Sequence, residues 1–165
     1  MAVPRLPYRI FSQAPEGAVD PAALVRAATR FFEADLDVLA LRDRRSEEPP
    51  VEGQELRVRL ESKRRGFRAE FVIRSRAATA DDHQAAHDAE ERGRAGGMGL
   101  LAARCPSLWE VTPEGDESEA ATLNLCAIAA TVALGPTLPP DESTLFGVRG
   151  AMERLERLTG ASLHR

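Results

Sequence analysis

The chain has 165 residues, of which 43% are hydrophobic and 29% are charged, a composition that fits one globular domain over residues 1–165 and excludes a disordered or fibrous chain. No apolar stretch reaches the roughly 18 residues that would cross a bilayer, and the N-terminal "MAVPRLPYRIFSQ" lacks the apolar core of a secretory signal. The formal net charge of −4 disfavours a dedicated nucleic-acid binder. We therefore expect a cytoplasmic protein of bacterial type.

The chain contains two cysteines, Cys105 and Cys126, with no CxxC spacing. Such sparse cysteines are typical of reduced thiols packed as small apolar side chains. A single disulfide between them is the alternative, and it would require an oxidising compartment.

The N-terminal quarter predicts a strand, a helix and a second strand. "PYRIF" is rich in β-formers and precedes a turn-like segment, so Tyr8–Phe11 is predicted to be an edge strand. Asp20 followed by Pro21 is a helix start, because the Asp side chain accepts from exposed N–H groups and Pro fits the first turn. The apolar stripe of this helix consists of Leu24, Val25, Ala28, Phe31 and Phe32. Alternation over residues 35–40 then indicates a strand.

The middle of the chain predicts a β-hairpin after an exposed loop. The polar, Pro-containing "RRSEEPPVEG" over residues 44–53 is typical of a loop. "ELRVRLE" and "FRAEFVIRSR" then alternate apolar with charged residues, and "SKRRG" joins them with Gly66 at a positive-φ position. Such alternation predicts an antiparallel sheet with one face in water.

A helix containing "DDHQAAHDAEERG" follows the hairpin and breaks at Gly96–Gly97. A strand around Leu108–Val111 comes next, and Trp109 within it is predicted to anchor the core. Ser118 is predicted to cap a central buried helix, because the following residues are apolar on every side.

Gly135–Pro136 is expected to end that helix, and a last helix is predicted to begin near Asp141 or Ser143. Its apolar residues at helical spacing are Leu145, Val148, Met152, Leu155 and Leu158. The order of elements predicts an α+β two-layer sandwich, with a mainly antiparallel sheet of about four to five strands and helices packed on one face.

One helix face carries residue types that bind transition metals. At 100° per residue, His83 and His87 share a face with Glu90 and Glu91, and two imidazoles with a carboxylate are a partial zinc site. The H-E-x-x-H motif is absent, because Gln84 occupies the position of the general base. The alternative is a solvated helix face, with alanines packed against the sheet and histidines turned towards water.

The predicted hairpin carries a basic outer face. Its arginines are Arg57, Arg59, Arg68 and Arg74. Three interpretations stay open: a solvated face with cross-strand Arg–Glu pairs, a surface for an acidic protein partner, and a contact with nucleic-acid phosphates. Interleaved glutamates and the lack of outward aromatics disfavour the last.

The sequence shows no convergent catalytic motif, so it favours a non-enzymatic protein-interaction module. Adaptor, chaperone and toxin-neutralising roles all fit, with the charged sheet face or an exposed helix as the binding surface and no cofactor. A small metal-dependent enzyme that holds a divalent transition metal such as zinc through His83, His87 and Glu90 or Glu91 is the second hypothesis. A nucleic-acid contact through the hairpin is the third. An unprotected edge strand also leaves pairing with a second copy open.

Overall fold

The computed structural model describes residues 6–14, 19–47, 50–115 and 118–159, in which six strands form one antiparallel sheet of order β2-β3-β4-β5-β1-β6. The strands are β1 (Tyr8–Ser12), β2 (Asp35–Glu47), β3 (Pro50–Ser62), β4 (Phe67–Ala77), β5 (Ser107–Pro113) and β6 (Thr137–Leu138). The helices are α1 (Pro21–Phe32), α2 (Ala80–Gly93), α3 (Met98–Ala103), α4 (Glu119–Ala133) and α5 (Val148–Thr159). The predicted α+β class is confirmed.

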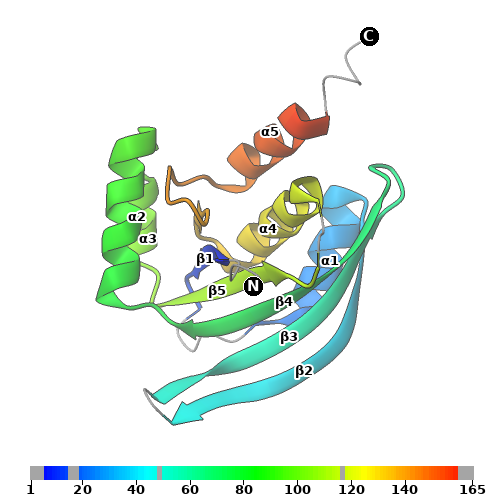
Figure 1. The fold of residues 1–165 in the computed structure, drawn as a ribbon, viewed down its shortest axis with the longest axis horizontal. Coiled ribbons are helices and arrows are strands. Elements are labelled where there is room, and N and C mark those ends of the chain that lie inside the picture. Colours follow the sequence, from blue (N-terminus) through cyan, green and yellow to red (C-terminus); the bar gives the residue numbers. More distant parts are fainter. Residues whose placement is uncertain (1–5, 15–18, 48–49, 116–117, 160–165) are drawn as a thin grey trace.

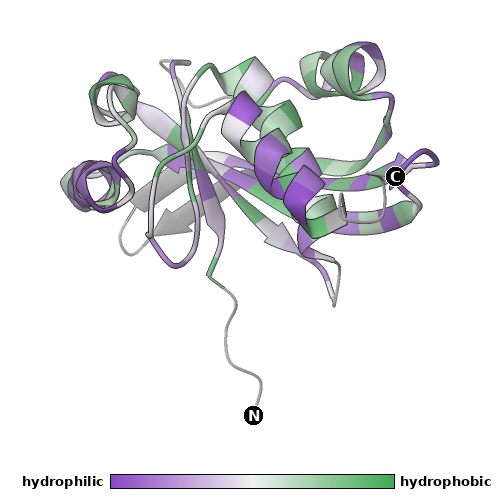
Figure 2. Cartoon of the chain, turned by 90° about the horizontal axis from the view of Figure 1, so that it is seen from above, coloured by the Kyte–Doolittle hydropathy of each residue, from purple (hydrophilic) through white to green (hydrophobic). Residues whose placement is uncertain are grey.

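The sheet curves around α1 and α4, and α5 packs on the far side of α4 (Figure 1). Hydrophobic and hydrophilic residues alternate along the strands (Figure 2), and the apolar face meets the two helices. Trp109 is 1% exposed in this core, as predicted. The helix α4 is buried on nearly all sides because it lies between the sheet, α1 and α5.

The helices α2 and α3 pack against the opposite face at one end of the sheet. Ile10 and Trp109 belong to the core under α1 and α4, whereas their neighbours Phe11 and Leu108 contact the second cluster. Successive side chains of a strand point to opposite faces, so this end of the sheet is covered on both sides.

The two cysteines lie on opposite faces of the sheet. Cys126 on α4 is part of the main core, and Cys105 is part of the cluster beneath α2 and α3. Both are buried and free, so no disulfide joins them. Burial raises the pKa of both thiols, which keeps them in the protonated, unreactive form.

Two predictions about strands are wrong. The loop predicted over residues 44–53 is the end of a β-ladder, in which Arg44 pairs with Gly53 and Glu47 with Pro50. Pro50 is tolerated because it is the first residue of its strand. The strand β1 is internal, because β6 pairs with the side that β5 leaves open.

The predicted starts of α1 and α4 are confirmed, with Asp20 and Ser118 as N-caps. The last helix begins at Val148, later than predicted. Asp141 accepts a hydrogen bond from the backbone of Ser143 at 3.0 Å, so it closes a tight turn instead of capping a helix.

Candidate functional site

The four residues of the predicted metal site point in different directions on α2. His83 is half-buried, stacks on Phe11 and donates from Nε2 to the carbonyl of Cys105 at 3.0 Å. His87 is exposed and lies 3.4 Å from Glu91. Glu90 accepts from the backbone N–H of Gly99 at 2.5 Å.

This arrangement does not assemble a metal site within the described residues, where no three His, Cys, Asp or Glu side chains lie close enough to hold an ion. The expectation that both histidines face water is wrong for His83. The helix α2 is oriented about its axis so that Asp82, Ala86 and Ala89 are buried. This orientation also brings His83 against the sheet.

The arginines of the sheet's outer face are held largely by glutamates of the same chain. The pairs are Arg57–Glu114 at 2.7 Å, Arg74–Glu55 at 2.7 Å and Arg59–Glu70 at 3.9 Å. The hydrogen bond from Arg74 lowers the pKa of Glu55. Arg68 is exposed. Cross-strand pairing therefore accounts for most of this charge, and a role in partner binding stays a prediction.

A buried ionic cluster fixes α2 to the sheet. Asp82 accepts hydrogen bonds from Arg76 at 2.6 Å and from Arg9 at 3.0 Å. It also accepts from the backbone N–H of Thr79 at 2.8 Å, within a capping box. Its lone pairs are thus fully used, so this carboxylate is suited to holding the fold and not to proton transfer.

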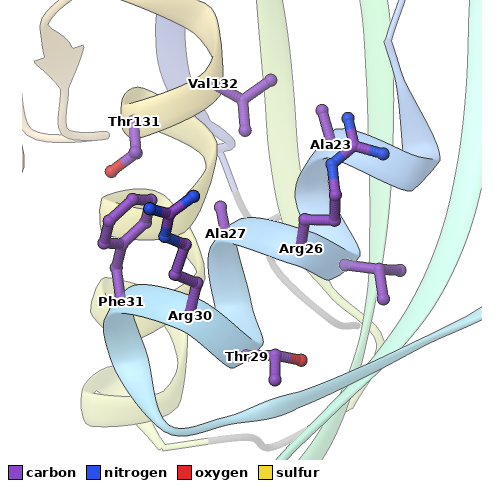
Figure 3. Close-up of a pocket in the computed structure, with 9 residues that line it drawn as sticks. Ala23, Arg26, Ala27, Thr29, Arg30, Phe31, Thr131 and Val132 are labelled. Carbon is purple, nitrogen blue, oxygen red and sulfur yellow. The ribbon is translucent and has the colours of Figure 1, made fainter.

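A hollow of about 620 Å³ lies between α1 and α4 (Figure 3), within the usual range for binding sites. Its lining is mainly apolar. The residues are Ala23, Val25, Arg26, Ala27, Thr29, Arg30, Phe31, Thr131 and Val132. We call this hollow, with the adjoining one described next, the α1–α4 groove.

A second hollow of about 460 Å³ shares Ala23 and Val132 with the first, so the two adjoin. Trp109 and Leu134 also line it. The indole Nε1 of Trp109 has no hydrogen-bond partner among the described residues. The α1–α4 groove therefore runs from the C-terminal end of α1 to the C-terminal end of α4.

Two large apolar side chains stand exposed along the groove: Phe31 and Leu134 are each 61% accessible. Leu134 ends α4 in the left-handed conformation, with φ of 60°, which costs a β-carbon-bearing residue about 1–2 kcal/mol. The helices α1 and α2 also end in left-handed residues, Glu33 and Arg94, but those are charged. Leu134 therefore differs from these two caps in exposing an apolar side chain, and not in its backbone conformation.

The charge of the groove is positive. Arg26 and Arg30 lie one turn apart on α1, and neither forms an ion pair with a described residue. Figure 3 shows Arg30 beside Phe31 and Arg26 beside Ala23, and the Arg30 guanidinium lies 5.4 Å from the Phe31 ring centre. Asp20, at the end near α4, is the one described carboxylate in the lining of either hollow.

A smaller hollow of about 230 Å³ lies beside Tyr8, Asp141 and Arg154. Burial raises the pKa of Tyr8 to about 12, so its hydroxyl stays protonated. The volume is below the usual range for a ligand site, and we give this hollow no role.

The sequence does not indicate the groove. The apolar stripe predicted for α1 includes Phe31 together with Leu24 and Ala28. Those two are fully buried, whereas Phe31 lies at the groove's rim, so the prediction is wrong for Phe31. Arg26 and Arg30 give no signal of their own, because isolated cations on a helix are ordinary solvated residues.

No family model, no curated protein and no solved structure matches the chain. Within the described residues, none of the helices is long and apolar enough to span a membrane.

Proposed function

We propose that the chain is a non-enzymatic protein-interaction module, and that its α1–α4 groove binds an amphipathic helix of a partner protein carrying acidic residues. The observation that carries the proposal is the combination of an apolar hollow of about 620 Å³ with two cations at its rim, Arg26 and Arg30. Apolar lining supplies affinity, and a small number of polar groups supply orientation.

Charge complementarity selects an acidic occupant. Arg26 and Arg30 are four residues apart, a spacing of one helical turn. Two carboxylates one turn apart on a partner helix would match this spacing. Desolvated Arg–carboxylate contacts of this kind fix the register of a bound helix and exclude basic partners.

The apolar rim selects a helix with a hydrophobic stripe. Helix-in-groove recognition uses anchors at successive turns on one face, and the groove offers Phe31, Val132 and Leu134 along its length. Covering Phe31 and Leu134 would remove two of the large exposed apolar side chains of the described chain from water.

The groove is favoured over the sheet's outer face because the two surfaces differ in free charge. Arg57 and Arg74 already contact glutamates at 2.7 Å, so a partner would have to displace intramolecular pairs. Arg26 and Arg30 carry no such pairs within the described chain. An acidic partner therefore gains more binding free energy at the groove than at the sheet's outer face, because no intramolecular ion pair has to be broken.

The proposal is tested by selecting binders from a phage-displayed peptide library on the immobilised full chain. We expect enrichment of peptides with apolar residues at helical spacing and two acidic residues one turn apart. The Kd of synthetic copies, measured by fluorescence anisotropy, should rise at least about tenfold for Phe31→Ser and for the double variant R26E/R30E, because such anchors dominate binding.

The matched control is Arg68→Glu, which reverses an exposed arginine on the sheet's outer face and should leave the Kd unchanged. Loss of binding in Arg68→Glu but not in the groove variants would place the interface on the sheet and contradict the proposal. Native mass spectrometry adds a second check. A small anionic amphiphile that co-purifies with the wild type but not with Phe31→Ser would mean that the groove holds a small molecule instead of a helix.

A further inference from the structure

One edge of the sheet is a long strand whose outer side pairs with no other strand of the described chain. The strand β2 has 13 residues and ends the strand order, so the backbone groups on its outer side are open to another strand. Val38 and Leu41 on this strand are 41% and 46% exposed. Their counterparts on β3, Val58 and Leu56, are fully buried. The apolar inner face of the sheet thus continues to β2, where its side chains are exposed to solvent.

A β-bulge interrupts the middle of β2. The register with β3 shifts between Val38 and Ala40, so Leu39 is the extra residue. In an unbroken strand, residues separated by an odd number of positions point to opposite faces. Across the bulge this rule is reversed, and residues 37 and 42 point to the same face.

The register with β3 shows which face each residue occupies. Val38 pairs with buried Val58, so Asp37 before it points to the sheet's outer face. Leu41 pairs with buried Leu56, so Arg42 after it also points outward. The strand therefore carries an acidic residue before the bulge and a basic one after it on the outer face. On the inner face, exposed apolar residues flank the bulge on both sides.

This pattern is self-complementary under a two-fold rotation. If β2 pairs antiparallel with β2 of a second copy, with the axis at the bulge, Asp37 lies opposite Arg42 of that copy and Val38 lies opposite Leu41. Directly opposed residues of an antiparallel pair share a face and contact each other. Each of these contacts occurs twice in an isologous interface.

We propose that β2 is a homodimerisation edge, joining two copies of this chain into one continuous antiparallel sheet. The contact is separate from the α1–α4 groove, because β2 contributes no residue to that lining. Arg42 also contacts Glu55 of its own chain, but Glu55 keeps Arg74 as a second partner at 2.7 Å. Arg42 can therefore turn towards the second copy without leaving Glu55 unpaired.

The test is a charge swap read by sedimentation velocity on the full chain over a range of concentrations. The wild type should sediment as a dimer. Asp37→Arg and Arg42→Asp should each dissociate it, raising the dimer Kd at least about tenfold, because both symmetry-related contacts become repulsive. An equimolar mixture of the two variants should recover the dimer, since position 37 of one variant and position 42 of the other again carry opposite charges.

Circular dichroism and thermal unfolding show whether each variant is folded, and Arg104→Asp, at an exposed site off the sheet, is the matched charge control. Leu41→Lys provides a second variant and should also be monomeric. Three results would each overturn the proposal: a monomeric wild type at all concentrations, a dimer that survives both single swaps, or a mixture that fails to reassociate. A peptide strand that binds the edge of a monomeric chain would assign β2 to a foreign partner.

Discussion

The carboxylate of Asp82 on α2 lies 2.6 Å from the guanidinium of Arg76 on β4, and it joins a helix to the outer face of the sheet. Arg9 on β1 approaches the same carboxylate at 3.0 Å and also contacts Glu142 at 2.8 Å. Asp82 is almost fully buried. The position of α2 thus depends on this charged side chain as well as on the alanines beside it.

Asp82→Asn should lower the free energy of unfolding by about 3 kcal/mol, because it removes the close charged partner of Arg76 and Arg9 and leaves Arg76 with only the more distant Glu110, at 3.6 Å. Chemical denaturation measures the change. The neighbouring Asp81→Asn is the control, since Asp81 is exposed and its loss should change stability by less than about 0.5 kcal/mol. Equal effects of the two substitutions would show that the cluster does not hold the helix.

The same cluster predicts how stability depends on pH. Burial raises the pKa of Asp82, but the hydrogen bonds from Arg76 and Thr79 outweigh burial, so the pKa lies well below its usual range. The unfolded chain binds this proton near an ordinary aspartate pKa of about 3.9. The contribution of Asp82 is therefore complete above about pH 5 and is lost progressively as the pH falls. Urea unfolding at a series of pH values should show a steeper acid loss for the wild type than for Asp82→Asn.

His83 and His87 should differ in their effect on stability. His83→Ala removes a hydrogen bond to Cys105 at 3.0 Å and a ring contact with Phe11, which together should cost about 1–2 kcal/mol. His87→Ala removes only an exposed pair with Glu91 and should be neutral within about 0.5 kcal/mol.

Thermal unfolding with and without Zn²⁺ separates this structural role from metal binding. An ion that binds only the folded chain raises the melting temperature, and the rise increases with the logarithm of the free ion concentration above its Kd. A zinc-dependent rise in the wild type that disappears in both histidine variants would instead support the metal hypothesis.

The long, strongly periodic segments of this fold could be predicted from sequence. The alternation in β3 and β4 has period two, which only a strand half-exposed to water satisfies. The apolar surface of α4 on every side fits only a helix surrounded by other elements. Asp20 before Pro21 identifies a helix start because the chemistry of the cap is local.

Features that depend on contacts distant in the sequence could not be predicted. The two-residue strand β6 has no periodicity to detect, yet it makes β1 an internal strand. The exposure of Phe31 depends on how α4 packs over α1. The angular position of Phe31 on its own helix gives no information about that packing. The bulge at Leu39 could not be predicted either. An alternating sequence pattern does not show where one residue is left unpaired, and only the register with β3 does.

The glycine after α4 shows how a distant contact changes a local cap. A β-carbon at Gly135 would lie 1.9 Å from the carbonyl oxygen of Phe11, so this glycine is required by the close approach of β1. Its φ is not positive, and the left-handed cap falls on Leu134 instead. The helix ends where the sequence predicts, but for a different reason.

Leu134→Gly should stabilise the free protein by about 1 kcal/mol, because glycine adopts the left-handed conformation without the penalty that leucine suffers. Little burial is lost, since Leu134 is mostly exposed. The same substitution should weaken the peptides selected on the α1–α4 groove, because it removes one end of the apolar rim. A gain in stability with a loss of binding is the expected signature of a side chain kept for its partner.

Leu134→Ala separates the two effects. Alanine keeps the strained φ but removes the apolar surface, so it should weaken peptide binding without raising the melting temperature. Differential scanning calorimetry and fluorescence anisotropy on the two variants provide both readouts. If Leu134→Ala binds the peptides as tightly as the wild type, the leucine belongs to the cap alone and the groove ends at Val132.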